Sequence, residues 1–143
     1  MKILVLNGPN LARLDIRDSK HYGDLNWEQL KSLIQVNAEE LGFEADVRQS
    51  DDEATLVGWL HEAADNNLPV IINPAAFTHY SVAIHDAAEM VKAPIIEVHL
   101  SNPMAREEFR HTSVISGVAK GTIAGFGANS YILALNALKS IVS

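Results

Sequence analysis

The sequence predicts an α/β fold in which a parallel sheet is covered by helices on both faces. Five short apolar runs alternate with longer amphipathic segments, which is typical of repeated βα units. The runs are continuously apolar, as expected for strands that are buried on both sides. Because a dinucleotide-binding glycine motif is absent, we predict the doubly wound, flavodoxin-like strand order 2-1-3-4-5. The length of 143 residues predicts one domain, residues 1–143.

The first two elements have clear boundaries. A strand at residues 3–6 is rich in Ile, Leu and Val, and it ends at the turn sequence of residues 7–10. A helix follows a long loop, because Asn26 and Gln29 can form a capping box at its start. Its apolar side chains recur at helical spacing until Gly42 ends it.

The remaining elements are predicted from the same kinds of signal. In order, they are a strand at 43–49, a helix capped by Ser50 or Asp51, a strand at 69–73, a helix at 81–92, a strand at 94–100, one or two helical turns at 103–109, a strand at 121–126 and a helix at 129–142. This alternation supports a sheet of parallel strands joined by right-handed crossovers.

The composition excludes several classes of protein. Without cysteine, the chain forms no disulfides or thiolate metal sites and has no thiol nucleophile. A net charge of −7 argues against nucleic acids and anionic membranes as partners. No apolar run reaches the roughly 18 residues that a membrane-spanning helix needs. We therefore expect a cytoplasmic protein that binds a small molecule.

Polar side chains gather where the predicted strands end. Asn7 follows the first strand, Asn73 ends the third, and His99 lies at the end of the fourth. The carboxyl ends of parallel strands share one edge, where ligands bind in such sheets. A lid loop at about residues 9–25 leaves the same edge and is longer than a usual βα loop. Amides suit a hydroxylated ligand, and the nearby arginines suit a carboxylate or phosphate.

Two interpretations of these residues remain open on the pattern alone. Tyr22 and Arg17 share the lid, and an arginine close to a tyrosine favours the phenolate, which is a good base for a proton beside a ketone. His99 suits an acid or a base. Alternatively, the asparagines form turns, Tyr22 packs on the surface, His99 is a satisfied buried histidine, and residues 106–110 form a solvated helix.

Four blocks of sequence stand out by their order and spacing. They are residues 7–11 with Arg17 and Tyr22-Gly23, residues 48–50, residues 73–83, and residues 96–102 with 106–110. Together they resemble type II 3-dehydroquinate dehydratase over nearly the whole chain. The resemblance implies a trans-dehydration of 3-dehydroquinate to 3-dehydroshikimate, in the shikimate pathway of aromatic amino acid biosynthesis or in the quinate pathway. It implies that neither a metal nor a cofactor takes part.

The resemblance also implies a role for each matching residue. Tyr22 would remove the C2 proton to give an enolate-like intermediate, and Arg17 would keep Tyr22 ionised. Asn10 would hold the water that hydrogen-bonds the enolate oxygen. His99, oriented by Glu97, would protonate the departing C1 hydroxyl.

Further residues are implied to bind the substrate or to complete the site. The substrate's carboxylate and hydroxyls would be bound by Asn73, His79, Leu100, Ser101 and Arg110. Arg106 would support the chemistry of the lid. Asp86 would reach into the site of a neighbouring subunit, in trimers that assemble into a dodecamer.

Some positions depart from the family pattern. Ala12, Asp15 and Ser19 replace residues that are usual in the lid, which puts its closure in question. Ala75 replaces a usual glycine and is expected to crowd the turn after the third strand, and His85 replaces a usual arginine at the implied subunit contact. Two rival classes remain: a non-catalytic binding module, and an enzyme of the same scaffold that acts on a related hydroxy acid.

Overall fold

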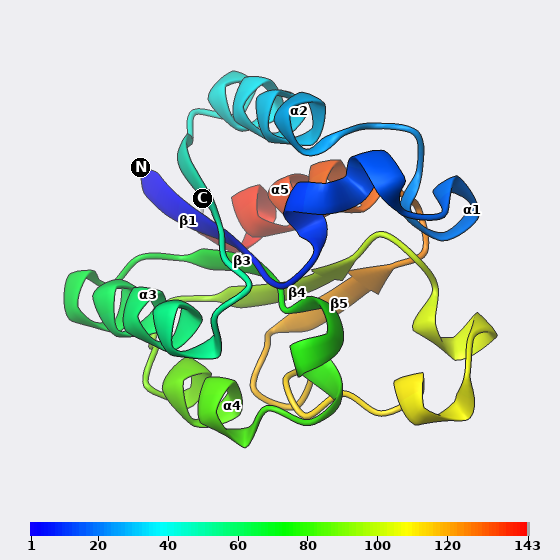
Figure 1. Ribbon diagram of the computed structural model, residues 1–143. Helices are drawn as coiled ribbons and strands as arrows, with labels where there is room; N and C mark the ends of the chain where they lie inside the picture. The colour runs from blue at the N-terminus through cyan, green and yellow to red at the C-terminus, as the bar shows by residue number, and fades with distance from the viewer. Residues whose placement is uncertain (143) are drawn as a thin grey trace.

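The computed structural model describes residues 1–142 and contains one parallel sheet within them (Figure 1). Its strands are β1 (Lys2–Asn7), β2 (Glu44–Gln49), β3 (Val70–Asn73), β4 (Ile95–His99) and β5 (Gly121–Ala124). They are ordered β2-β1-β3-β4-β5, and each neighbouring pair is parallel. The predicted doubly wound, flavodoxin-like order is therefore confirmed.

Helices cover both faces of this sheet. The helices are α2 (Trp27–Glu40), α3 (Glu53–Asn66), α4 (Val82–Glu89) and α5 (Asn129–Val142). Figure 1 shows α2 and α5 on one side of the sheet and α3 and α4 on the other. Each pair of helices encloses its own cluster of buried apolar side chains.

Strand β1 supplies side chains to both clusters. Ile3 and Val5 lie in the cluster with α2 and α5, whereas Leu4 and Leu6 lie in the cluster with α3 and α4. All four are 0% exposed. Burying each such side chain stabilises the fold by about 1.5–3 kcal/mol. This two-sided burial explains why the strand reads as a continuous apolar run.

Two helix boundaries differ from the prediction. The side chain of Asp52, rather than Ser50 or Asp51, caps α3 by accepting a hydrogen bond from Ala54 N at 3.2 Å. Three consecutive residues can cap a helix here, so sequence alone does not choose among them. Helix α4 begins after its N-cap, Ser81, and ends at Glu89 rather than near residue 92. Its last turn tightens to i→i−3 bonds as the chain approaches Pro94.

Other segments refine the expectations. Residues 103–109 were expected to form one or two helical turns, and two 3₁₀ turns occur, at Pro103–Ala105 and Glu108–Arg110. The lid is more ordered than a polar loop, because it contains a 3₁₀ helix at Leu11–Ile16 and the short helix α1 (Ser19–Tyr22). Leu11 and Leu14 anchor it in the core. None of the helices in residues 1–142 has the length and apolar character to cross a membrane.

Candidate active site

The carboxyl ends of β1, β3 and β4 bring three polar side chains to one edge of the sheet. Asn7 and Asn73 are direct neighbours in the strand register, and His99 ends β4. The lid and the 3₁₀ turns after β4 lie on the same side of the molecule (Figure 1). Ligands bind at this edge in open α/β sheets, so the topology itself places the site.

A pocket at this edge contains most of the predicted site residues. Those lining it are Asn10, Arg17, Tyr22, Asn73, His79, His99, Leu100, Ser101, Arg106 and Arg110. Glu97 and Asp86 do not line it. The structure thus joins the lid, the ends of β3 and β4, and the turns that follow β4 in one cavity.

Asn7 and Asn73 are held by a tyrosine that the sequence analysis missed. The hydroxyl of Tyr131 on α5 donates to Asn7 Oδ1 at 2.5 Å, and Asn73 Nδ2 donates to that hydroxyl at 2.9 Å. Burial raises the pKa of Tyr131 above its ordinary value, so the phenol remains neutral. Asn7 also donates to the carbonyl of Arg48 at 3.0 Å, which gives it a structural role. The one sequence signal that could have revealed Tyr131 is a single tyrosine on the apolar face of a helix.

Asn73 keeps one amide hydrogen for a ligand. Its Oδ1 accepts from Ala75 N at 3.1 Å, and one Nδ2 hydrogen goes to Tyr131. The second Nδ2 hydrogen has no partner assigned to it within residues 1–142. An amide fixed in this way is a rigid donor in the lining of the pocket.

Tyr22 packs against arginines. The Arg17 guanidinium carbon lies 3.6 Å from the centre of the Tyr22 ring, and that of Arg106 lies 5.1 Å from it. Burial is the largest cause that lowers the pKa of Arg17. The phenol of Tyr22 acts to raise this pKa, whereas the charges of Arg106 and Arg110 lower it further. Arginine nevertheless stays protonated at neutral pH. The lid therefore places a phenol in a strongly positive environment.

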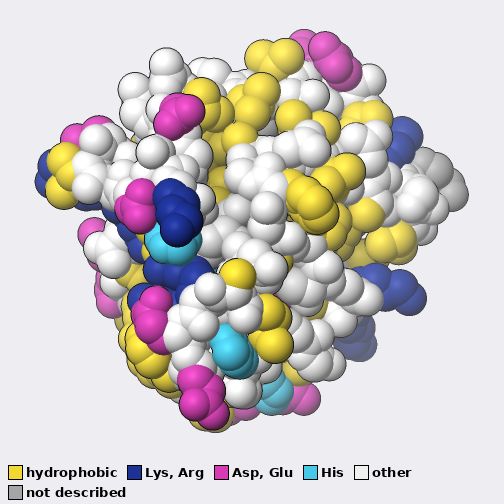
Figure 2. Space-filling view, turned by 90° about the vertical axis from the view of Figure 1, so that its right-hand side faces the viewer, with side chains coloured by type: hydrophobic (Ala, Val, Ile, Leu, Met, Phe, Trp, Pro, Cys, Tyr) yellow, Lys and Arg dark blue, Asp and Glu magenta, His cyan; other side chains and the backbone are white. Residues whose placement is uncertain are grey.

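Basic side chains gather in one area on this side of the protein. Figure 2 views the molecule from the side of the lid and shows Lys and Arg side chains beside a His side chain in one area, with acidic groups around them. Arg106 and Arg110 are partly buried in the pocket, whereas Glu107 and Glu108 are exposed. Residues 106–110 are therefore not a uniformly solvated helix.

Arg106 offers an unused donor. Its Nη1 donates to Ser101 Oγ at 3.2 Å, while its buried Nε has no hydrogen-bond partner within residues 1–142. Arg110 donates from Nε to Glu107 Oε2 at 2.8 Å. An unpaired buried guanidinium N–H is costly, and an anionic ligand would satisfy it.

His99 contacts a completely buried carboxylate. Its Nε2 hydrogen-bonds to Glu97 Oε2, and Glu97 is 0% exposed. Burial acts to raise the pKa of Glu97, but hydrogen bonds and charge from His99, with hydrogen bonds from Ser116 and Thr78, hold it below its ordinary value. Since Nε2 faces Glu97, Nδ1 is the ring nitrogen left for a ligand.

His79 and Asn10 are each fixed by backbone contacts. His79 Nδ1 lies 2.8 Å from the carbonyl of Thr112, and because a carbonyl only accepts, Nδ1 carries the hydrogen and leaves Nε2 free for a ligand. Asn10 has a left-handed backbone with φ of 71°. Its N–H donates to Asp51 Oδ1 at 2.9 Å, which ties the start of the lid to the end of β2.

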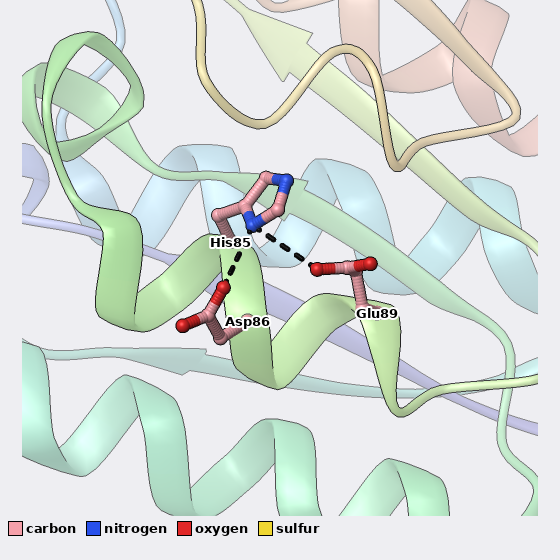
Figure 3. Close-up of side chains that lie close together, drawn as sticks. All are labelled: His85, Asp86 and Glu89. Atoms are coloured by element: carbon pink, nitrogen blue, oxygen red, sulfur yellow. Dashed lines mark hydrogen bonds and ion pairs between the residues drawn. The ribbon is translucent and has the colours of Figure 1, made fainter.

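Asp86 lies away from its own pocket. It is exposed on α4, where the ring of His85 lies between two carboxylates (Figure 3). His85 Nδ1 is 3.0 Å from Asp86 Oδ1 and 3.3 Å from Glu89 Oε1.

The departures at residues 12, 15, 19 and 75 differ in their consequences. Asp15 forms an exposed ion pair with Arg13 at 3.1 Å, and such pairs contribute little. Ser19 begins α1, while Ala12 is exposed. Ala75 has a φ of 52°, a left-handed conformation that glycine adopts without strain. Residue 75 therefore carries backbone strain, whereas the crowding expected there stays a prediction.

A parallel α/β sheet with a phenol, an imidazole–carboxylate pair and arginines around one pocket defines a metabolic enzyme for a polar, anionic small molecule. The comparisons with known proteins identify the family. The model of class II dehydroquinases matches residues 1–139. The chain belongs to this family.

Curated relatives and solved structures agree with this assignment. The chain is 53% identical over 138 residues to a 3-dehydroquinate dehydratase of Salinispora tropica, covering 96% of each chain. It is 51% identical over 139 residues to that of Sinorhizobium medicae, covering 97% of this chain and 94% of the relative. The crystal structure of type II dehydroquinase from Propionibacterium acnes superposes with a TM-score of 0.95 at 51% identity, covering 97% of this chain and 96% of that one.

We predict that Ala75→Gly stabilises the protein. Removing Cβ relieves the left-handed strain and should raise the free energy of unfolding by about 0.5–1 kcal/mol. Urea unfolding at one protein concentration measures this change. Ala76→Gly is the matched control: it lies in the same turn without positive φ, so it should be destabilising. Equal destabilisation by both variants would show that residue 75 is not strained.

Proposed function

We propose that this chain catalyses the trans-dehydration of 3-dehydroquinate to 3-dehydroshikimate, with Tyr22 as base and His99 as acid. The observation that carries the proposal is the two-sided pocket, in which the lid presents Tyr22 and the end of β4 presents His99. Membership of the class II dehydroquinase family and the names of the relatives support the choice of substrate.

The first step removes the proton at C2. The neighbouring ketone acidifies this proton, and a phenolate is basic enough to take it. The guanidinium of Arg17 against the Tyr22 ring stabilises the phenolate and then the negative charge of the enolate. Asn10, fixed by Asp51, would hold a water on the enolate oxygen.

The second step breaks the C1–oxygen bond. Hydroxide is a poor leaving group, so His99 delivers a proton to it, and water departs as the C1–C2 double bond forms. The buried carboxylate of Glu97 stabilises the imidazolium form that serves as the acid. Tyr22 gains one proton and His99 loses one, so a proton transfer through solvent restores both groups.

Binding of the substrate uses the remaining pocket residues. Asn73, His79 and Arg110, with the Leu100-Ser101 segment, would bind the carboxylate and hydroxyls, and Arg106 would support the lid near Tyr22. Every step uses groups of this chain, so the proposal includes neither a metal nor a cofactor. An assay for the conjugated enone product, by its ultraviolet absorbance, tests this activity against a binding module or a different hydroxy acid as substrate.

The proposal extends to cellular context and assembly. A single domain, residues 1–143 with a lid at about 9–25, would act in the cytoplasm in the shikimate or quinate pathway. The chain would form trimers that assemble into a dodecamer. The exposure of Asp86 outside its own pocket supports this, because a cyclic contact can deliver it to the next subunit.

We predict that Tyr22→Phe lowers kcat by about 10²–10⁴-fold, the usual contribution of a general base, with little change in KM. Steady-state kinetics of enone formation measure both parameters. The matched control is Tyr80→Phe, at an exposed tyrosine outside the pocket, which should behave like the wild type. A near-normal kcat for Tyr22→Phe would remove Tyr22 as the base.

We predict that Asp86→Ala and Tyr22→Phe proteins regain activity when their subunits are exchanged. Each is expected to be nearly inactive alone, but mixed trimers contain sites that combine an intact Tyr22 with an intact Asp86 from a neighbour. The control is Glu89→Ala, one turn further along α4, which should be active without any exchange of subunits. If native mass spectrometry shows mixed trimers and activity does not return, Asp86 does not serve a neighbouring site.

A further inference from the structure

Hydroxyl groups surround the buried carboxylate of Glu97. Thr78 Oγ1 lies 2.5 Å from Oε2, and Ser116 Oγ lies 2.5 Å from Oε1. Ser113 Oγ is 3.1 Å from both oxygens. Together with His99, these contacts occupy both oxygens of a side chain that is 0% exposed. Neither serine belongs to a helix or strand, and no sequence motif marked them.

The hydrogen bonds of Ser113 fix the direction of its hydroxyl. Its Oγ accepts from Ile115 N at 3.1 Å and from Ser116 N at 3.0 Å. Both lone pairs are then engaged, so the hydroxyl can only donate. Its single hydrogen lies within reach of Thr78 Oγ1 and of both Glu97 oxygens, so the serine turn presents a donor to this cluster.

The other two hydroxyls donate to Glu97 for related reasons. Thr78 Oγ1 is 2.8 Å from Ser113 Oγ, which has no free lone pair to accept from it, so Thr78 donates to Glu97. Ser116 Oγ accepts from Thr122 Oγ1 at 3.2 Å and directs its own hydrogen to Glu97. Hydroxyl hydrogens that point at Glu97 stabilise its carboxylate more than its neutral carboxyl form. The surroundings are built for the charged form.

Several basic groups line a cavity that also borders Glu97. His99 contacts Glu97 directly, and His79, Arg110 and His111 also line the space next to it. His79 is bound to the carbonyl of Thr112, His111 to that of Arg106, and Arg110 to Glu107. These three have partners of their own, so the hydroxyls and His99 are the groups that stabilise the Glu97 charge.

We propose that Thr78, Ser113 and Ser116 are positioning residues that hold Glu97 as a carboxylate against His99. The inference rests on the proposed function, in which His99 is the acid. A fixed negative charge at Nε2 keeps a proton on that nitrogen. Nδ1 can then carry a second proton toward the substrate, which makes the imidazolium the species that acts.

The test compares the ionisation of Glu97 among hydroxyl variants of the full chain. Ser116→Ala and Thr78→Val each remove one donor, Ser116→Thr keeps it, and Thr112→Val removes an exposed hydroxyl from the same segment as a control. Infrared spectra across acidic pH follow the band of protonated carboxyl groups. The component that is missing in Glu97→Gln reports Glu97 itself, without any need for turnover.

The expected result is an upward shift of the Glu97 titration by about one pH unit or more in Ser116→Ala and Thr78→Val, since a hydrogen bond to a charged group is lost. Ser116→Thr and Thr112→Val should titrate like the wild type. At neutral pH, kcat should fall with KM little changed, because a carboxylate held by fewer donors orients His99 less well. Unshifted infrared titrations in both donor variants overturn the inference. Shifted titrations with an unchanged kcat leave it standing and instead contradict the acid role of His99.

Discussion

The negative charge buried at Glu97 is the constraint on which the site depends. A carboxylate cannot be removed from water without paired charge and hydrogen bonds, so its partners must converge on it. They come from the turn after β3, from the segment before β5 and from β4 itself. Satisfying one charge therefore fixes the positions of separate stretches of chain and orients His99.

The other side of the pocket uses charge of the opposite sign. Arg17 and Arg106 pack against Tyr22, and the lid that carries Tyr22 is anchored by Leu11 and Leu14 in the core. The lid thus supplies a phenol in a positive environment, while β4 supplies an imidazole next to a negative one. These opposite environments suit the two tasks of the proposed function, proton removal by Tyr22 and proton delivery by His99.

The fold was largely predictable because both faces of the sheet are buried, so apolar runs such as residues 3–6 were unambiguous. The pocket residues could be identified because strand ends and family blocks mark them. The predicted cap of α3 was wrong, because Ser50, Asp51 and Asp52 can all cap a helix. Asp51 instead accepts from Asn10 in the lid, and Ser50 accepts from the N–H of Asp52. Tyr131 and Ser116 were missed for a similar reason: their roles arise from contacts between distant segments, which local patterns do not encode.

The division of labour between the lid and β4 is tested most directly by His99→Ala in deuterated water. The account predicts that exchange of the C2 proton of 3-dehydroquinate continues in part, because Tyr22 still forms the enolate, while enone formation is lost. His61→Ala, at an exposed histidine on α3, serves as the control and should retain both activities. Loss of exchange and dehydration in equal proportion, or full retention of dehydration, would contradict the separate roles of Tyr22 and His99.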